Sequence, residues 1–128
     1  MSEGGSSRLK TLLDYATKIG VQARYDRVEK AQIENLLASL EMVEDPQISP
    51  LVTAAYAHRQ AARLKRGYRT AKLINEAMEW LYRQNLGREE ARRLLGMAKW
   101  IFESLEKVRL SIDVRDLTFQ KLLGELRR

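Results

Sequence analysis

The chain has 128 residues, 45% hydrophobic and 31% charged, which gives it enough length and apolar content to fold as one domain. The absence of cysteine excludes disulfide bonds, thiolate catalysis and thiolate zinc sites, and it favours a reducing cytoplasm as the location. The formal net charge of +6 favours a polyanionic partner. No apolar run approaches the roughly 18 residues of a membrane span, so we expect no membrane partner.

The first seven residues, MSEGGSS, are small and polar, and we expect residues 1–7 to form a disordered tail. A single α-helical domain is then predicted for residues 8–128. Apolar residues recur with the helical period from Leu9 to Ile19. Gly20 follows at the place where a left-handed cap would end this first helix, and the polar link VQARYD comes after it.

A second helix is predicted for residues 28–44, because apolar residues recur there on one face and the two prolines of EDPQISP then stop the run. Ser49 and Pro50 look like an N-cap followed by proline at the first helical position, so a third helix is predicted to begin there. This helix is expected to stop or kink at Gly67, where glycine can adopt the left-handed conformation.

A fourth helix is predicted from about Thr70, and a fifth has the most regular apolar face of the chain. A last helical segment is predicted near Ser111 or Asp113, with Asp113 as its cap. No segment alternates with the period of a strand, and the connections are short. The predicted fold is therefore an all-α, single-domain bundle of five to six helices. The expected buried residues are Ile74, Ala77, Met78 and Leu81 in the fourth helix, and Ala91, Leu94, Leu95, Ala98, Ile101, Phe102, Leu105 and Val108 in the fifth.

Catalytic chemistry is not indicated by this sequence. His58 is the only histidine, which excludes a histidine-rich metal cluster and leaves one candidate general base. The adjacent pair Glu89 and Glu90 points about 100° apart on a helix and fits the first turn, where acids stabilise the helix dipole. No glycine-rich phosphate loop or serine elbow is present. We predict a protein that is not an enzyme and needs no metal or cofactor.

One window of the chain, between Asp45 and Glu76, lacks acidic residues altogether. Cations three and four residues apart lie along one ridge of a helix, where they repel one another unless an anionic ligand neutralises them. The spacing predicts one basic strip that contacts nucleic-acid phosphates without sequence preference. The basic strip comprises Arg59, Arg63, Lys65, Arg66, Arg69 and Lys72.

Two further side chains in this window are candidates for stacking on exposed bases, namely His58 and Tyr68. Their alternative roles are an ordinary surface histidine and a packed tyrosine. A second group of cations, Arg88, Arg92 and Arg93, is diluted by neighbouring glutamates, and we interpret it as a solvated helix face.

The order of three segments resembles a known family. These are AQIENLL (31–37), PLVTAAYAHRQAARLKRG (50–67) and LLGMAKWIFESLEKV (94–108). Together they look like the small helical subunit of CRISPR effector complexes, nearest to the type III-A version, with the type I-A version as the other candidate.

That resemblance implies a non-catalytic subunit of an antiviral ribonucleoprotein, present in several copies, whose basic strip touches guide RNA, target duplex or a displaced strand. It also implies contacts with backbone subunits and with itself, for which Trp80, Tyr82 and Trp100 are candidates. Two other interpretations stay open at this point: a helical protein-interaction adaptor with a merely soluble basic face, and a small nucleic-acid-binding regulator.

Overall fold

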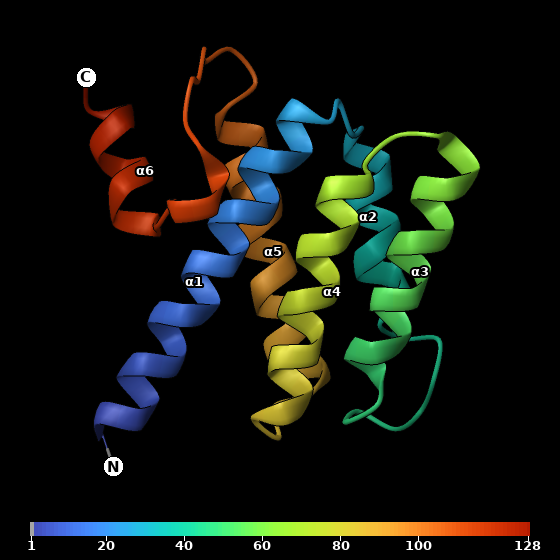
Figure 1. Ribbon diagram of the computed structural model, residues 1–128. Helices are drawn as coiled ribbons and strands as arrows, with labels where there is room; N and C mark the ends of the chain where they lie inside the picture. The colour runs from blue at the N-terminus through green and yellow to red at the C-terminus, as the bar shows by residue number, and fades with distance from the viewer. Residues whose placement is uncertain (1) are drawn as a thin grey trace.

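The computed structural model describes the backbone of residues 2–128 and the side chains of residues 7–128. Over this range the chain forms six α-helices and one short 3-10 helix, with no strand, which confirms the predicted all-α bundle (Figure 1). No helix in this range is both long and apolar enough to cross a membrane. The elements are α1 (Ser2–Tyr25), α2 (Lys30–Ser39), α3 (Ser49–Leu64), α4 (Tyr68–Arg83), α5 (Arg88–Ser104), η1 (Val114–Asp116) and α6 (Phe119–Leu126).

The disordered tail expected for residues 1–7 stays a prediction. Met1 lies outside the described residues, and α1 includes the backbone of residues 2–7. The domain boundary expected at residue 8 also stays a prediction.

Gly20 does not end the first helix, and the prediction of a cap there was wrong. Its backbone is helical, α1 continues to Tyr25, and Val21 and Ala23 in the expected link are fully buried. A Cβ at position 20 would lie 2.8 Å from both the Ala98 carbonyl oxygen and Ile101 Cγ2 of α5. The glycine therefore allows α1 and α5 to approach closely, which is a role that depends on the partner helix.

The boundary between α2 and α3 also differs from the prediction. α2 ends at Ser39 rather than at residue 44, and residues 40–44 form a turn followed by bends. Ile48 occupies the N-cap position of α3, while the buried Ser49 hydroxyl donates to the Leu40 carbonyl. Pro50 lies in the first turn, as predicted. The serine is thus used to fix the α2–α3 connection rather than to cap a helix.

The predicted buried faces of α4 and α5 are confirmed, with one exception. Val108 follows the end of α5 and is 40% exposed. α4 begins at Tyr68, slightly before the predicted start at Thr70. Asp113 caps η1 by accepting a hydrogen bond from the Arg115 backbone N–H, while Thr118 caps α6.

The most extensive helix pairs are α1 with α5 and α3 with α4. Their shared core holds the fully buried residues Ile74, Met78 and Leu94. This arrangement brings the α1–α2 turn (26–29) and the α3–α4 turn (65–67) to the same end of the bundle (Figure 1). We call this end of the bundle the double-turn end.

We expect Gly20→Ala to lower the free energy of unfolding by about 1–3 kcal/mol, because the added methyl group would overlap α5 backbone and side-chain atoms. Gly96→Ala is the matched control, since nothing lies within 4 Å of the position that its added methyl group would occupy on the outer side of α5. That control should gain about 0.5–1 kcal/mol from helix propensity. Equilibrium urea unfolding measures both, and equal effects of the two substitutions would contradict the close-contact role of Gly20.

Candidate nucleic-acid interface

The six cations of the basic strip are exposed, and none of them has an acidic partner among the side chains of residues 7–128. Eight ion pairs form among the side chains of residues 7–128, and none of them includes a member of the strip. Within the same range, Arg66 is the one strip residue whose side chain donates a hydrogen bond, to the Arg27 carbonyl at 3.2 Å. The positive charge of the strip is therefore available to a ligand. Its members are Arg59, Arg63, Lys65, Arg66, Arg69 and Lys72.

The cations at the start of α5 behave differently. Arg88 is mostly buried and donates to the carbonyls of Leu40 (3.0 Å), Val43 and Glu44 (3.2 Å). It thereby satisfies carbonyl groups that the end of α2 and the following turn leave open. The interpretation of this group as a solvated face was wrong for Arg88, which fastens α5 to α2.

Arg92 is likewise engaged. Its guanidinium pairs with Glu41 just beyond α2 and with Glu89 on its own helix. Arg88 and Arg92 therefore hold α5 to α2 and the segment after it, whereas within the basic strip only Arg66 contacts another element among the described residues.

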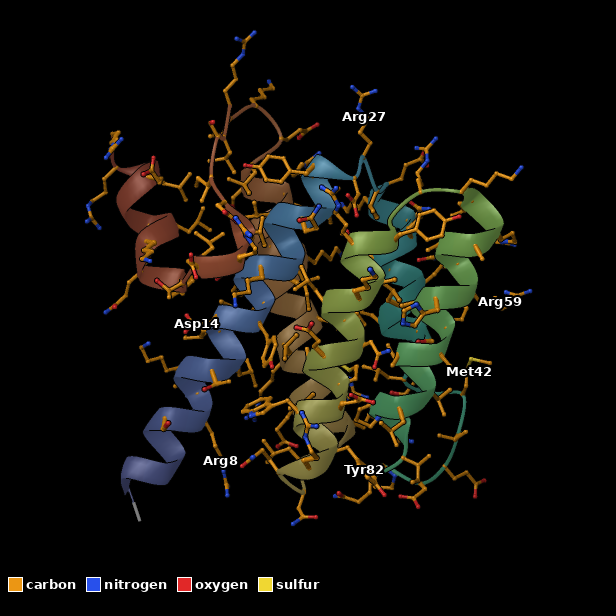
Figure 2. All side chains as sticks on the ribbon, viewed as in Figure 1. Arg8, Asp14, Arg27, Met42, Arg59 and Tyr82 are labelled. Carbon is orange, nitrogen blue, oxygen red and sulfur yellow. The ribbon has the colours of Figure 1, made fainter. Side chains whose placement is uncertain are left out.

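The double-turn end adds a cation that the sequence pattern did not indicate. Arg27 lies in the α1–α2 turn with a left-handed φ of 58°, and its carbonyl accepts the hydrogen bond from Arg66. Its side chain is exposed and extends away from the bundle (Figure 2). The two residues are 39 positions apart. No local pattern could have joined them, because the contact exists only once both turns reach the same end.

An aspartate directly after α1 fixes the start of α4. Asp26 Oδ2 accepts hydrogen bonds from the Thr70 backbone N–H (2.9 Å) and hydroxyl (2.8 Å), while Oδ1 accepts one from the Gln22 side chain (2.9 Å). The carboxylate therefore caps α4 across the bundle, which also stabilises the positive end of the helix dipole. This cap sets the position of Arg69, one residue earlier.

The structure divides the predicted basic strip into two parts joined by the α3–α4 turn. Arg59 lies on the outer side of α3, at the edge of the bundle away from α1 (Figure 2). Arg69 and Lys72 instead line pockets with Lys18 and Gln22 of α1. The division arises because residues after Gly67 belong to a helix that runs back beside α3, so their exposed flank faces another neighbour.

The two candidate stacking residues occupy different surroundings. His58 Nε2 lies 3.0 Å from the Asn75 side-chain nitrogen, so the imidazole bridges α3 and α4 at the surface. Tyr68 is the first residue of α4 and is 54% exposed beside Arg69. Tyr68 thus retains an accessible ring face, whereas the imidazole of His58 is held by a side-chain contact.

The three aromatic residues that are candidates for binding partner subunits differ in their exposure. Trp80 packs against Tyr15 with ring centroids 5.7 Å apart, and it borders the core. Trp100 is 67% exposed on the outer side of α5, and Tyr82 near the end of α4 is exposed as well. Only the last two offer apolar surface to another molecule.

Comparison of the chain with protein-family models, with curated proteins and with solved structures found no match in any of the three.

We expect Arg88→Ala to lower the free energy of unfolding by about 2–3 kcal/mol, because it leaves the carbonyl groups of the α2–α3 connection without their charged donor. Arg59→Ala should change it by no more than about 0.5 kcal/mol. Urea unfolding of both variants tests the distinction between engaged and available arginines. A loss after Arg59→Ala as large as that after Arg88→Ala would contradict it.

Proposed function

We propose that the protein binds the phosphates of a nucleic acid without sequence specificity, through the basic strip and Arg27. The observation that carries this proposal is the absence of ion-pair partners for the strip among the side chains of residues 7–128. Elsewhere the same protein places arginines against carbonyls and carboxylates. A polyanion would supply the missing countercharge, and release of its bound ions would favour association.

Phosphate contact rather than base reading fits the distribution of these side chains. The cations are spread over the outer side of α3, the two turns and the start of α4. A surface spread over several elements can follow a backbone, whereas base reading uses side chains that one element presents together to the edges of bases. Tyr68 adds one exposed ring at the start of α4, on which an unpaired base can stack.

The biological setting that we propose is a non-catalytic small subunit of a CRISPR effector complex. Its support is the resemblance of three helical segments, together with a basic surface in the segment 50–67. In such an assembly, several copies would lie along one guide RNA, target duplex or displaced strand. Exposed Trp100 and Tyr82 would then contact neighbouring subunits.

The same two exposed aromatics favour one alternative, a helical protein-interaction adaptor. In that case the basic strip would serve solubility only. If the protein binds nucleic acid, removing the charge of the strip should weaken that binding. If the protein is an adaptor, the same change should have no effect on nucleic-acid retention.

We expect the wild-type protein to bind fluorescent single-stranded RNA, single-stranded DNA and duplex DNA weakly, with affinities that fall steeply with salt. Replacing Arg59, Arg63 and Arg66 with alanine should lower the slope of log K against log salt by roughly two to three units, because each phosphate contact contributes slightly less than one. Fluorescence anisotropy over a salt series measures the slope. For long RNA, the stoichiometry should rise with length.

The matched control replaces three exposed cations outside the strip, Arg8, Arg93 and Arg127, with alanine. It removes the same net charge and should leave most of the affinity intact. Equal losses of nucleic-acid affinity in both triple variants would mean that binding depends only on the net charge of the protein and not on the strip. No binding by the wild-type protein at low salt would favour the adaptor, and protection of one defined duplex sequence in footprinting would favour a regulator.

A further inference from the structure

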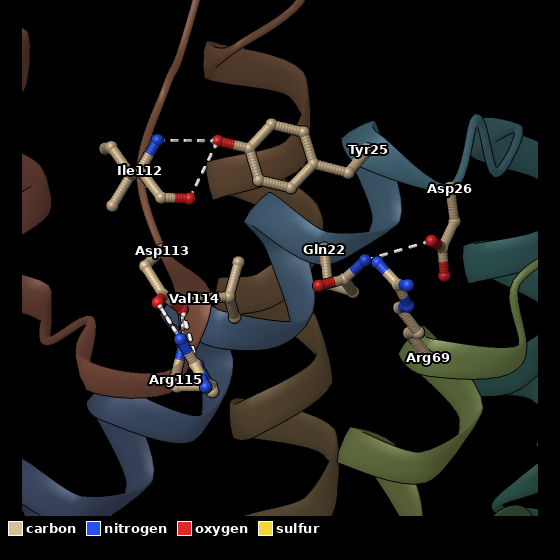
Figure 3. A pocket seen from close by; sticks show the side chains of 8 residues that line it. All are labelled: Gln22, Tyr25, Asp26, Arg69, Ile112, Asp113, Val114 and Arg115. Atoms are coloured by element: carbon tan, nitrogen blue, oxygen red, sulfur yellow. Dashed lines mark hydrogen bonds and ion pairs between the residues drawn. The ribbon is translucent and has the colours of Figure 1, made fainter.

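A groove lies between the end of α1, the start of α4 and the segment 112–115 (Figure 3). Its volume is about 480 Å³, and an adjoining pocket of about 330 Å³ continues it along α4. The two share Gln22, Arg69, Val114 and Arg115. Both volumes fall within the range of about 300–1,000 Å³ that is typical of small-molecule sites.

Cations from three separate elements line the groove and its adjoining pocket. Arg69 and Arg115 line both, whereas Lys18 and Lys72 line the adjoining pocket. Lys18 comes from α1, Arg69 and Lys72 come from α4, and Arg115 comes from η1. None of Lys18, Arg69 and Lys72 has an ion-pair partner among the side chains of residues 7–128.

The acidic side chains of the groove are mostly occupied. Asp26 accepts hydrogen bonds from Gln22 and Thr70, and Asp113 accepts several from Arg115. Glu76 lines the adjoining pocket, where the cations Lys18, Arg69 and Lys72 outnumber it. The groove and its adjoining pocket therefore offer more unsatisfied donors than acceptors, and an anion is the ligand that matches this excess.

Tyr25 gives the groove one flat apolar wall. Its hydroxyl donates to the Ile112 carbonyl (3.0 Å) and accepts from the Ile112 N–H (2.9 Å), which fixes the ring against the 112–115 segment (Figure 3). The ring is still 41% exposed. A fixed aromatic face beside arginine and lysine side chains is a combination suited to a base and its phosphate.

We propose that this groove is a binding site for a single nucleotide, with Arg69, Lys72 and Lys18 holding the phosphate and Tyr25 stacking on the base. The ligand is either a free nucleotide or the phosphorylated end of a strand, since both present the same chemistry. The proposal goes beyond binding by the strip, because it requires a discrete, saturable site that Arg59, Arg63 and Arg66 do not line.

Asp113 acts as an internal competitor in this site. Its carboxylate binds the Arg115 side chain, with distances of 3.1 Å from Nε and 2.6 Å from Nη2. The same side-chain and backbone hydrogen bonds from Arg115 lower the pKa of Asp113 to about 2, so the carboxylate is charged at every pH at which the protein would be studied. A nucleotide phosphate can bind the Arg115 side chain only by displacing the Asp113 carboxylate from it.

The test is titration of the full chain with adenosine 5′-monophosphate and uridine 5′-monophosphate, followed by calorimetry and by amide chemical shifts. The double variant Lys18→Gln/Lys72→Gln should weaken binding by about tenfold or more, because it removes two of the three cations that hold the phosphate. Asp113→Asn should tighten binding several-fold, since it frees Arg115 while its amide oxygen still caps η1. The control Arg59→Gln/Arg63→Gln removes the same charge from the strip and should leave the nucleotide affinity unchanged.

Short oligonucleotides with and without a 5′-phosphate separate the two sources. A 5′-phosphorylated dinucleotide that binds much more tightly than the mononucleotide assigns the site to a strand end, and equal affinities assign it to a free nucleotide. The proposal would be overturned by amide chemical shifts that do not change at millimolar nucleotide. It would also be overturned if the Arg59/Arg63 control lost as much nucleotide affinity as the groove variant. Because mononucleotide binding is measured without any strand, this outcome is independent of whether the basic strip retains RNA.

Discussion

The close contact between α1 and α5 at Gly20 is the constraint on which the arrangement of this bundle depends. Because no side chain separates the helices there, the last turns of α1 continue as a buried helix with Val21 and Ala23 in the interior. Arg24 then stacks over the Phe102 ring at 3.8 Å and donates to the Phe102 carbonyl at 2.7 Å. Just beyond the helix, Asp26 reaches α4. The helix approach thus determines where the double-turn end forms.

The protein uses its positive charge in two ways that the net charge of +6 does not distinguish. Arg24, Arg88 and Arg92 each bind carbonyls or carboxylates of another element. Lys30 pairs with Glu103, which raises the pKa of the lysine and lowers that of the glutamate. Among the described side chains, the basic strip forms no ion pair, and Arg66 alone donates to a carbonyl, that of Arg27. Its charge has a cost to folding through mutual repulsion, and an external anion is the natural compensation.

The sequence was sufficient for features that depend on local periodicity. The buried faces of α4 and α5 follow from the spacing of their apolar residues, and so does the all-α class. The role of Gly20 was misjudged because glycine serves both caps and close contacts, and only the partner helix decides between them. Ser49 was misjudged for a similar reason, since its acceptor lies on the preceding segment.

The candidate sites show the same limit. The window without acids identified the exposed cations of the strip, and their exposure agrees with that pattern. Arg27 and the groove were not predicted, because Lys18, Arg69 and Arg115 are far apart in sequence and meet through tertiary packing. The pairing of Asp113 with Arg115 is local, yet its significance for the groove also depends on α1 and α4 lying opposite.

The C-terminal segment gives the groove a property that its lining does not reveal. Among the described helices, η1 and α6 pack only against α1, through Leu117, Leu122 and the hydrogen bond from the Phe119 N–H to Asp14. A segment attached to one neighbour opens at lower free energy than the whole domain unfolds. One wall of the groove therefore exists only in the closed fraction of molecules, and the observed affinity of any occupant is its intrinsic affinity multiplied by that fraction.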